Sequence, residues 1–193
     1  KAGIAPSSTL TVANPLSSDF VHMRTSLITS ALATVAANQG MTSQGELFES
    51  AMIYRKNEGA ALPDELPRVA VFSYGPEQDD RYFRRIKGAF DAWRKAENKA
   101  DMAMVRVTDD PLWHPGRSVS VIADGKEIGR IGEIHPAIAR RFGVDRRVAA
   151  FDIDLTAFIA APNSARAYHP IPQIPPVLRD AAFIVSERVE YAS

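Results

Sequence analysis

Two histidines and a glutamate near the middle of the chain have the residue types of a metal site. Glu133 and His135 are two positions apart, so on a β-strand their side chains would share one face. With His114 they would form a two-histidine, one-carboxylate set of the kind found in hydrolytic metal sites. Each histidine, however, precedes a proline, which is typical of a turn or a helix cap. A stand-alone metal-dependent hydrolase and a structural role for both histidines therefore remain open.

A second acidic group and a glycine-rich string offer weaker chemistry. Asp109 and Asp110, with Asp101, could supply a carboxylate pair for hydrolysis, but acidic clusters beside a proline are usually solvated loops. The glycine-rich residues 125–133 lack the order GxGxxG and lie within an expected hairpin, so they cannot direct a helix N-terminus at a phosphate. No nucleotide-binding loop is predicted.

The composition is that of an ordinary folded protein. The chain has 193 residues, 46% hydrophobic and 24% charged, with 23 basic residues balancing 23 acidic ones. This balance gives no global attraction to nucleic acid or membrane, and no stretch approaches the roughly 20 apolar residues of a membrane span. The absence of cysteine excludes thiolate chemistry and fits a reducing, cytoplasmic location. Both ends of the chain suggest a piece of a longer protein.

The expected elements do not follow a regular βαβ alternation. Strands are expected at residues 9–13, 47–55, 68–74, 102–107, 118–123, 127–134, 148–155 and 179–187, and short or long helices near 25–38, 79–98, 136–142 and 156–161. Asp124-Gly125 supplies the two positive-φ residues of a tight type I′ turn. The pattern predicts an α+β fold, a largely antiparallel sheet flanked by helices.

The stretch from Asn14 to Glu49 predicts a helix with two packing faces. A cap at Ser17 or Ser18, or a later start at Thr25, leads into a helix that ends near Asn38, with Gly40 as a left-handed stop. Its apolar stripe comprises Leu27, Ile28, Ala31, Leu32 and Val35. A second stripe, of small residues, comprises Ser26, Ser30, Ala33 and Ala37. Such a face allows another helix to approach closely, so a partner is expected there.

The helix near residues 79–98 is expected to start at Asp79 or Asp80 and to bury an aromatic face. That face comprises Tyr82, Phe83, Ile86, Ala89, Phe90 and Trp93. Gly88 inside this helix costs about 1 kcal/mol against alanine, which predicts a close approach by another backbone.

Strings along the chain resemble, in order, the core domain of the bacterial phenylalanyl-tRNA synthetase beta chain. They are NPLS, MRTSL and LFE within residues 14–49, and FRRIKGAFDAW, HPGRSVSV, IGRIGEIHP and VAAFDIDL within residues 83–155. IPPVLRDAAFIV, residues 174–185, resembles the opening of the ferredoxin-like anticodon-binding domain that follows that core. The resemblance implies a class II synthetase fold and three segments: a core at residues 1–161, a proline-rich linker at 162–176, and the first strand of a truncated anticodon-binding domain at 177–193.

The resemblance also implies a division of labour between two chains. In that family the alpha chain carries aminoacylation, whereas the beta-chain core is catalytic-like and inactive. The helix from Arg24 to Asn38 is the expected interface with the alpha chain, through Arg24, Ser26, Leu27, Ser30, Ala33 and Ala37. The implied assembly is (αβ)₂, which uses ATP, Mg²⁺, phenylalanine and tRNA(Phe). The isolated chain is expected to be inactive and to self-associate through this helix face.

The sequence lets the inactivity be checked. A working class II site holds ATP with one arginine on a strand and another at a glycine-rich strand-to-helix junction, because their charge offsets the triphosphate. The strings LFES and GRIGEIHP present neither arginine in that context, and Arg130 is followed by a glutamate and a His-Pro step. No catalytic, cofactor-binding or metal-binding residue is therefore assigned. The arginine pairs at 84–85, 140–141 and 146–147 could contact a tRNA backbone or form solvated faces.

Overall fold

The computed structural model describes the core of the chain and a few residues near its end. The described residues are 9–17, 21–76, 79–106, 110–165, 177, 179–182, 184 and 186. Of the expected linker, only residues 162–165 are described. Of the expected strand at 179–187, residues 179–182, 184 and 186 are described, and none of them is in a strand. The division into three segments therefore stays a prediction.

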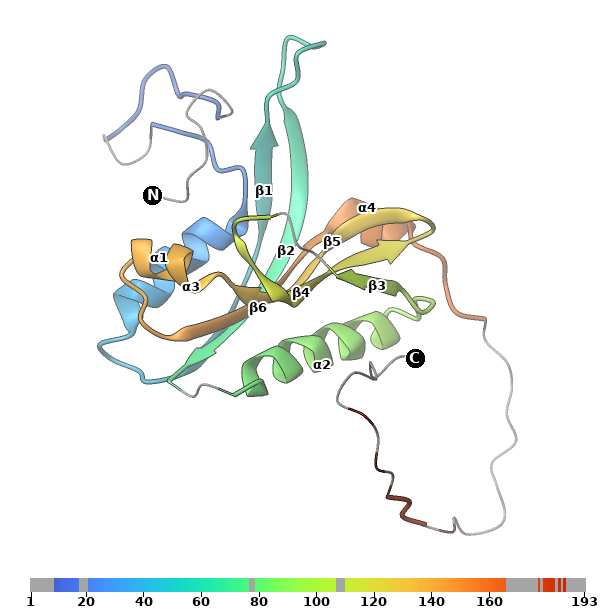
Figure 1. Ribbon diagram of the computed structural model, residues 1–193. Helices are drawn as coiled ribbons and strands as arrows, with labels where there is room; N and C mark the ends of the chain where they lie inside the picture. Colours follow the sequence, from blue (N-terminus) through green and yellow to red (C-terminus); the bar gives the residue numbers. More distant parts are fainter. Residues whose placement is uncertain are drawn as a thin grey trace.

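Six antiparallel strands form one sheet with helices on both faces (Figure 1). The order across the sheet is β1-β2-β6-β5-β4-β3, with bounds Gly45–Arg55 (β1), Asp64–Gly75 (β2), Ala103–Arg106 (β3), Trp113–Ala123 (β4), Lys126–Ile134 (β5) and Arg147–Asp154 (β6). Cores on the two faces include residues of α1 (Leu27–Asn38) and α3 (Pro136–Arg141) on one side, and of α2 (Arg81–Ala96) and α4 (Leu155–Ala160) on the other. This architecture confirms the predicted α+β fold.

Strand β6 lies inside the sheet and is covered on both faces. It pairs with β2 on one side and β5 on the other, and all its residues except the first and last are buried. A strand covered on both faces reads as a continuous apolar run, which Val148 to Phe151 follow. Asp152 breaks this run and is nevertheless buried, so its charge needs a partner within the fold.

The β4–β5 hairpin forms at the predicted turn. Asp124 has φ 48° and Gly125 has φ 73°, as a type I′ turn requires. The hairpin sets the register that places Arg130 opposite Ser120 on β4 and opposite Asp152 on β6. A local turn therefore brings Arg130 to the centre of the sheet.

Helix α1 buries the predicted apolar stripe but starts later than predicted. Ser26 is its N-cap and accepts a hydrogen bond from the Ile28 N–H at 3.1 Å, so the helix begins at Leu27 rather than after Ser17, Ser18 or Thr25. The helix ends at Asn38, as predicted. Gly40 is not a left-handed stop, because the chain leaves through a right-handed turn in which the Met41 and Thr42 N–H groups donate to the Asn38 carbonyl.

Helix α2 packs an aromatic cluster against the other face. Tyr82, Ile86 and Phe90 are buried, and Trp93 stacks on Phe158 of α4 with ring centroids 3.9 Å apart. The predictions for Ala89 and Gly88 were wrong. Ala89 is exposed, and no atom of the described part of the chain lies within 4 Å of where a Cβ at position 88 would stand. The face that carries both residues points outward from the sheet.

The first turn of α2 uses both candidate aspartates. Asp80 is the N-cap residue but makes no capping bond with its side chain. The Asp79 carboxylate instead accepts from the Arg81 N–H at 3.0 Å and pairs with the Arg81 guanidinium. This hydrogen bonding lowers the pKa of Asp79.

Strands β1 and β2 continue past the rest of the sheet as a two-stranded arm (Figure 1). Pairing of β2 with β6 starts at Arg68, whereas pairing with β1 continues out to Arg55 and Asp64. The connection is therefore shorter than predicted, because residues 64–67 belong to β2. Pro67 is tolerated there because that stretch of β2 has no β6 partner that needs its N–H.

The predicted strand at residues 9–13 was wrong, since Thr11 forms only an isolated bridge with His22.

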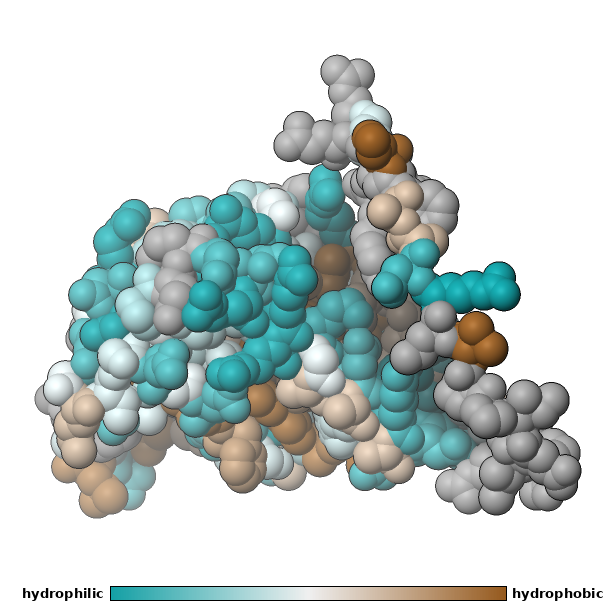
Figure 2. Space-filling model, turned by 90° about the horizontal axis from the view of Figure 1, so that it is seen from below, coloured by the Kyte–Doolittle hydropathy of each residue, from teal (hydrophilic) through white to brown (hydrophobic). Residues whose placement is uncertain are grey.

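The surface on the side of α2 is largely hydrophilic. Figure 2 views the molecule from below, the side on which Figure 1 places α2, and shows hydrophilic side chains over much of this face, with hydrophobic ones gathered toward one margin. No helix within the described residues is long and apolar enough to cross a bilayer.

Candidate functional site

A charged groove lies between α1, the root of the β1–β2 arm and the central strands. Its volume is about 340 Å³. Apolar residues of α1, β1 and β2 form part of the wall, namely Ile28, Ile53 and Leu66. The charged lining comes from β1, β2, β5, β6 and the segment before β4, and comprises Arg55, Arg68, Arg130, Asp110, Glu127, Asp152 and Asp154.

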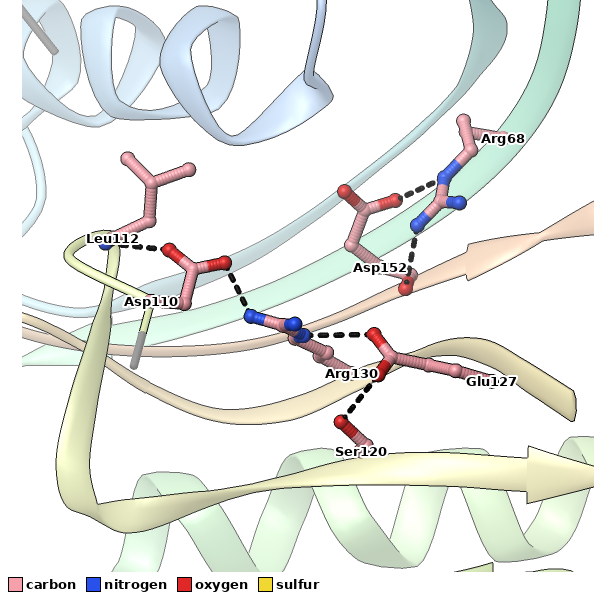
Figure 3. A network of polar contacts seen from close by, with 7 residues as sticks. All are labelled: Arg68, Asp110, Leu112, Ser120, Glu127, Arg130 and Asp152. Atoms are coloured by element: carbon pink, nitrogen blue, oxygen red, sulfur yellow. Dashed lines mark hydrogen bonds and ion pairs between the residues drawn. The ribbon is translucent and has the colours of Figure 1, made fainter. Parts of the chain in front are cut away.

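Arg130 on β5 is held from two sides (Figure 3). Its Nε donates to Glu127 Oε1 at 2.9 Å, and its Nη1 donates to the Asp110 carboxylate. Glu127 is itself fixed by the Ser120 hydroxyl, which donates to Oε2 at 2.8 Å. Asp110 is fixed by the Leu112 N–H, which donates to Oδ1 at 2.8 Å. The Arg130 guanidinium is therefore neutralised by two carboxylates that cannot easily turn away.

Arg68 on β2 is paired in the same manner with its neighbour on β6. Its Nε donates to Asp152 Oδ1 at 2.8 Å and its Nη2 to the Asp152 carbonyl at 3.0 Å. The two side chains are only 13% and 10% exposed. Burial raises the pKa of Asp152, and the Arg68 guanidinium opposes part of that shift. The pair is thus a buried structural ion pair whose loss on one side would leave an uncompensated charge.

Taken together, the groove is more acidic than basic. Three arginines face four carboxylates, and the two arginines on the central strands are already paired. A triphosphate needs uncompensated positive charge at its oxygens, and Arg68 and Arg130 do not offer it because carboxylates already pair with them. The two central arginines are therefore not available to a phosphate group in this arrangement.

The residues predicted to form a subunit interface divide into two groups. Arg24, Ser26, Leu27 and Ser30 make contacts inside the chain. Leu27 has no exposed surface, and the Ser26 side chain caps α1. These four residues therefore contribute first to fixing α1 on its own sheet.

Glu49 of β1 joins two of them. Arg24 Nη1 lies 2.5 Å from Glu49 Oε1, and the Ser30 hydroxyl donates to Oε2 at 2.9 Å. Arg24 also donates from Nε to the Met52 carbonyl at 2.8 Å. Arg24, which precedes α1, and Ser30, in its first turn, are thereby both bound to β1.

Ala33 and Ala37 form the second group. Both are exposed, as are Thr34 and Asn38 beside them. The Thr34 hydroxyl and the Asn38 amide each donate to a carbonyl one turn earlier in α1, at 3.1 and 2.8 Å. This outer face of α1 presents small side chains and satisfied polar groups, and it is the part of the helix that remains available to a partner.

The proposed metal ligands do not form a metal centre. Glu133 is 2% exposed and its Oε2 lies 3.1 Å from Arg117 and 3.0 Å from Arg147. His114 and His135 stack with ring centroids 6.2 Å apart, and each Nδ1 accepts from a backbone N–H. Among the described residues no group of three or more metal-ligating side chains is present. The described residues therefore do not support the hydrolase hypothesis, and His135 is the N-cap of α3.

The other candidates are dispersed. Asp101 pairs with Arg94 at 2.7 Å, Asp110 belongs to the groove, and Asp109 lies outside the described residues. Of the arginine pairs, residues 84 and 85 bind Asp80 and Glu46, and Arg147 binds Glu133. Residues 140 and 141 are exposed at the end of α3.

Sequence reasoning singled out Arg130 and Asp110 but missed the other charged members of the groove. Arg68 and Asp152 are 84 positions apart, and nothing local links them. The one available signal was an aspartate inside the apolar run of β6, because a buried carboxylate requires a cation. Glu49 was also missed, although it stands on the same strand face as Leu47 and Ala51, which pack against the core.

Comparisons with known proteins agree with this geometry. Residues 4–155 match the family described as the phenylalanyl tRNA synthetase beta chain CLM domain. The phenylalanine–tRNA ligase beta subunit of Lactiplantibacillus plantarum is 28% identical over 189 residues, covering 93% of this chain and 23% of that protein. The one from Listeria monocytogenes is 26% identical over 205 residues, covering 100% of this chain and 25% of that protein. The chain therefore spans about a quarter of the length of these relatives.

A solved structure supports the fold alone. The pyrrolysyl-tRNA synthetase of Desulfitobacterium hafniense superposes with a TM-score of 0.62 at 13% identity, covering 79% of this chain and 52% of that one. The six-stranded antiparallel sheet is thus one that an aminoacyl-tRNA synthetase also has. Since the family match covers most of the sheet and its helices, the chain belongs to the phenylalanyl tRNA synthetase beta chain CLM domain family.

Proposed function

We propose that this chain is a non-catalytic core module of a phenylalanine–tRNA ligase beta subunit. In this role it supports a catalytic alpha subunit within an (αβ)₂ assembly in the cytoplasm. The assembly would use ATP and Mg²⁺ to join phenylalanine to tRNA(Phe), with the nucleotide and the metal bound by the alpha subunit. The observation that carries the proposal is the neutralised groove, in which carboxylates occupy both central arginines, Arg68 and Arg130.

The absence of catalysis follows from electrostatics. A triphosphate entering the groove would meet Asp110, Glu127 and Asp152 at the same positions as the arginines. Displacing those carboxylates would leave them unpaired, at a cost of several kcal/mol for a buried pair broken on one side. The fold can therefore keep the shape of a synthetase core without ATP binding.

The alpha subunit would dock on the outer face of α1. Ala33 and Ala37 are exposed there, and small side chains allow two helices to pack at short range. Close packing at the buried centre is a property of stable interfaces. The other four predicted interface residues would fix the position of α1 on its own sheet. They are Arg24, Ser26, Leu27 and Ser30.

The catalytic part of the proposal is tested with the isolated chain and with the reconstituted assembly. Calorimetric titration with ATP and Mg²⁺ should show no binding to the isolated chain, and phenylalanyl-adenylate should form only when the alpha subunit is present. Adenylate formation by the isolated chain would refute the scaffold role.

The interface is tested by steric replacement. Ala33→Trp with Ala37→Trp should leave the helical signal of the chain unchanged and abolish co-purification with the alpha subunit. Ala92→Trp is the matched control, because Ala92 is exposed on α2. Unchanged association of the double variant would remove the outer face of α1 from the interface. The same double variant should also end any self-association of the isolated chain.

A further inference from the structure

We propose that one buried water molecule bridges Ser73 and Glu133 beneath α2. This site lies on the face of the sheet opposite the groove, and it goes beyond the proposed function because it rests on the packing of that face alone. Ser73 has no exposed surface and Glu133 is 2% exposed. Among the described residues, nothing hydrogen-bonds to the Ser73 Oγ or to the Glu133 Oε1. A buried polar atom without a partner is costly, so both atoms favour a ligand that can bond to them.

The register of the sheet places the two side chains on one face, on either side of Ala149. Ser73 on β2 is directly opposite Ala149 on β6, and Ala149 is directly opposite Glu133 on β5. Residues directly opposite one another in an antiparallel pair project to the same side of the sheet. Ala149 belongs to the core that contains Tyr82 and Ile86 of α2. Both polar side chains therefore face the layer beneath α2.

The residue between them is small enough to leave room for one water. Neighbouring strands are about 4.8 Å apart, so Ser73 and Glu133 are separated by about 9.6 Å across β6. A water that joins two oxygens through two hydrogen bonds spans about 5.6 Å, and the two side chains reach over the remaining distance. Ala149 has no atom beyond its Cβ, and it has no exposed surface. A water above its methyl group would therefore be enclosed.

The other oxygen of Glu133 holds the carboxylate in place. Oε2 lies 3.1 Å from Arg117 Nη1 and 3.0 Å from Arg147 Nε. Arg147 also donates from Nη1 to the carbonyl of Asp79, just before α2. The carboxylate cannot turn outward to solvent without breaking both ion pairs. Oε1 is therefore kept inside the fold, where only a buried donor can reach it.

A neutral ligand suits this site better than an ion. The two arginines already balance the charge of Glu133, so no net negative charge is left to attract a cation. An anion would be repelled by the Oε1 acceptor. Water can donate to Oε1 and accept from the Ser73 hydroxyl, which is both a donor and an acceptor. Buried waters in folded proteins commonly satisfy polar groups in this manner.

The test locates and counts buried water in the 193-residue chain by NMR. A cross-peak between the Ala149 methyl group and water is expected in NOE spectra, with the sign that marks a long-lived water rather than passing solvent. Oxygen-17 relaxation dispersion of the solvent then gives the number of long-lived waters for the unchanged chain and for each variant.

Two variants remove the water by different means. Ser73→Ala deletes one of its partners and should weaken the cross-peak at the Ala149 methyl group at least fivefold. Ala149→Val fills the space above residue 149 and should lower the number of long-lived waters by one. Ser118→Ala is the matched control, because Ser118 is 3% exposed but its hydroxyl already donates to the His114 carbonyl at 2.9 Å. The control should leave both measurements unchanged.

The outcomes decide the proposal in either direction. A cross-peak that is present in the unchanged chain and lost in Ser73→Ala supports the water bridge. The proposal is overturned if the Ala149 methyl group contacts no long-lived water, if Ser73→Ala keeps the full cross-peak, or if a folded Ala149→Val keeps the same number of waters. If Ala149→Val does not fold, Ser73→Ala decides alone. The scaffold role is independent of each result, because ATP binding and association with the alpha subunit are measured separately.

Discussion

We expect Glu49 to hold α1 on the sheet through its contacts with Arg24 and Ser30. The sequence predicted both of these residues at a subunit interface. The perturbation is Glu49→Gln, which keeps the shape of the side chain and removes its charge. In the structure Glu49 pairs with Arg24 at 2.5 Å and accepts from the Ser30 hydroxyl at 2.9 Å. The change therefore weakens an ion pair and a hydrogen bond together.

The magnitude follows from exposure. The Arg24 and Glu49 side chains are 36% and 28% exposed, so the ion pair is screened and contributes about 0.2–1 kcal/mol. The hydrogen bond from Ser30 contributes about 0.5–1.5 kcal/mol. We expect Glu49→Gln to lower the free energy of unfolding by about 1–2 kcal/mol. For a chain of this size each kcal/mol lowers Tm by about 2–4 °C.

The assay is thermal and urea unfolding followed by circular dichroism. A double-mutant cycle of Glu49→Gln with Ser30→Ala should give a coupling energy of at least about 0.5 kcal/mol, since the two residues share a bond. Glu58→Gln, an exposed glutamate in the arm, is the control and should leave Tm unchanged. An unchanged Tm for Glu49→Gln, or strictly additive effects with Ser30→Ala, would refute the reasoning.

Four further outcomes are expected. Phe90→Ala, at a fully buried position, should lower the free energy of unfolding by about 3–5 kcal/mol; a loss below 1 kcal/mol would contradict the α2 packing. Gly132→Ala should lower it by about 1–3 kcal/mol, because the new Cβ would lie 2.4 Å from the Ser118 Cβ and 2.6 Å from the Arg117 carbonyl oxygen; an unchanged urea midpoint would count against this contact. Burial, with the Arg117 and His135 charges, lowers the pKa of His114 below 6.5, so the unfolded chain binds more protons and stability should fall as pH drops below 6.5; His114→Asn should flatten that fall, and parallel curves from pH 8 to 5 would reject it. Burial raises the pKa of Glu133 above 4.5, so the folded chain binds more protons and its stability relative to Glu133→Gln should increase as pH falls toward 4.5; a constant difference would contradict this.

Local features of the sequence determined most of the secondary structure. Asp124-Gly125 specifies its turn because two positive-φ residues in succession have few other uses. The apolar stripe of α1 and its end at Asn38 were also readable, because period and stop signals are local. The start of α1 could not be read from the sequence, because several residues are competent N-caps, namely Ser17, Ser18, Thr25 and Ser26. Tertiary packing selects Ser26.

The order of the family-like strings also gave the family from sequence alone, in agreement with the α+β fold that the expected elements predict. Local rules failed at Gly88 and Gly40. A glycine in a helix signals close approach only when something approaches, and a glycine after a helix is left-handed only when the following turn requires it.

The character of the groove was decided by tertiary structure. Arg68 meets Asp152 across 84 residues, and Arg130 meets Asp110 across 20. These pairings depend on strand order and on register, neither of which any single segment specifies. Whether an arginine is free to bind a phosphate is a property of the carboxylates that the folded sheet places beside it. The sequence by itself could show that the synthetase arginines were out of context, and only the fold could show that Arg68 and Arg130 in the groove are already paired with carboxylates.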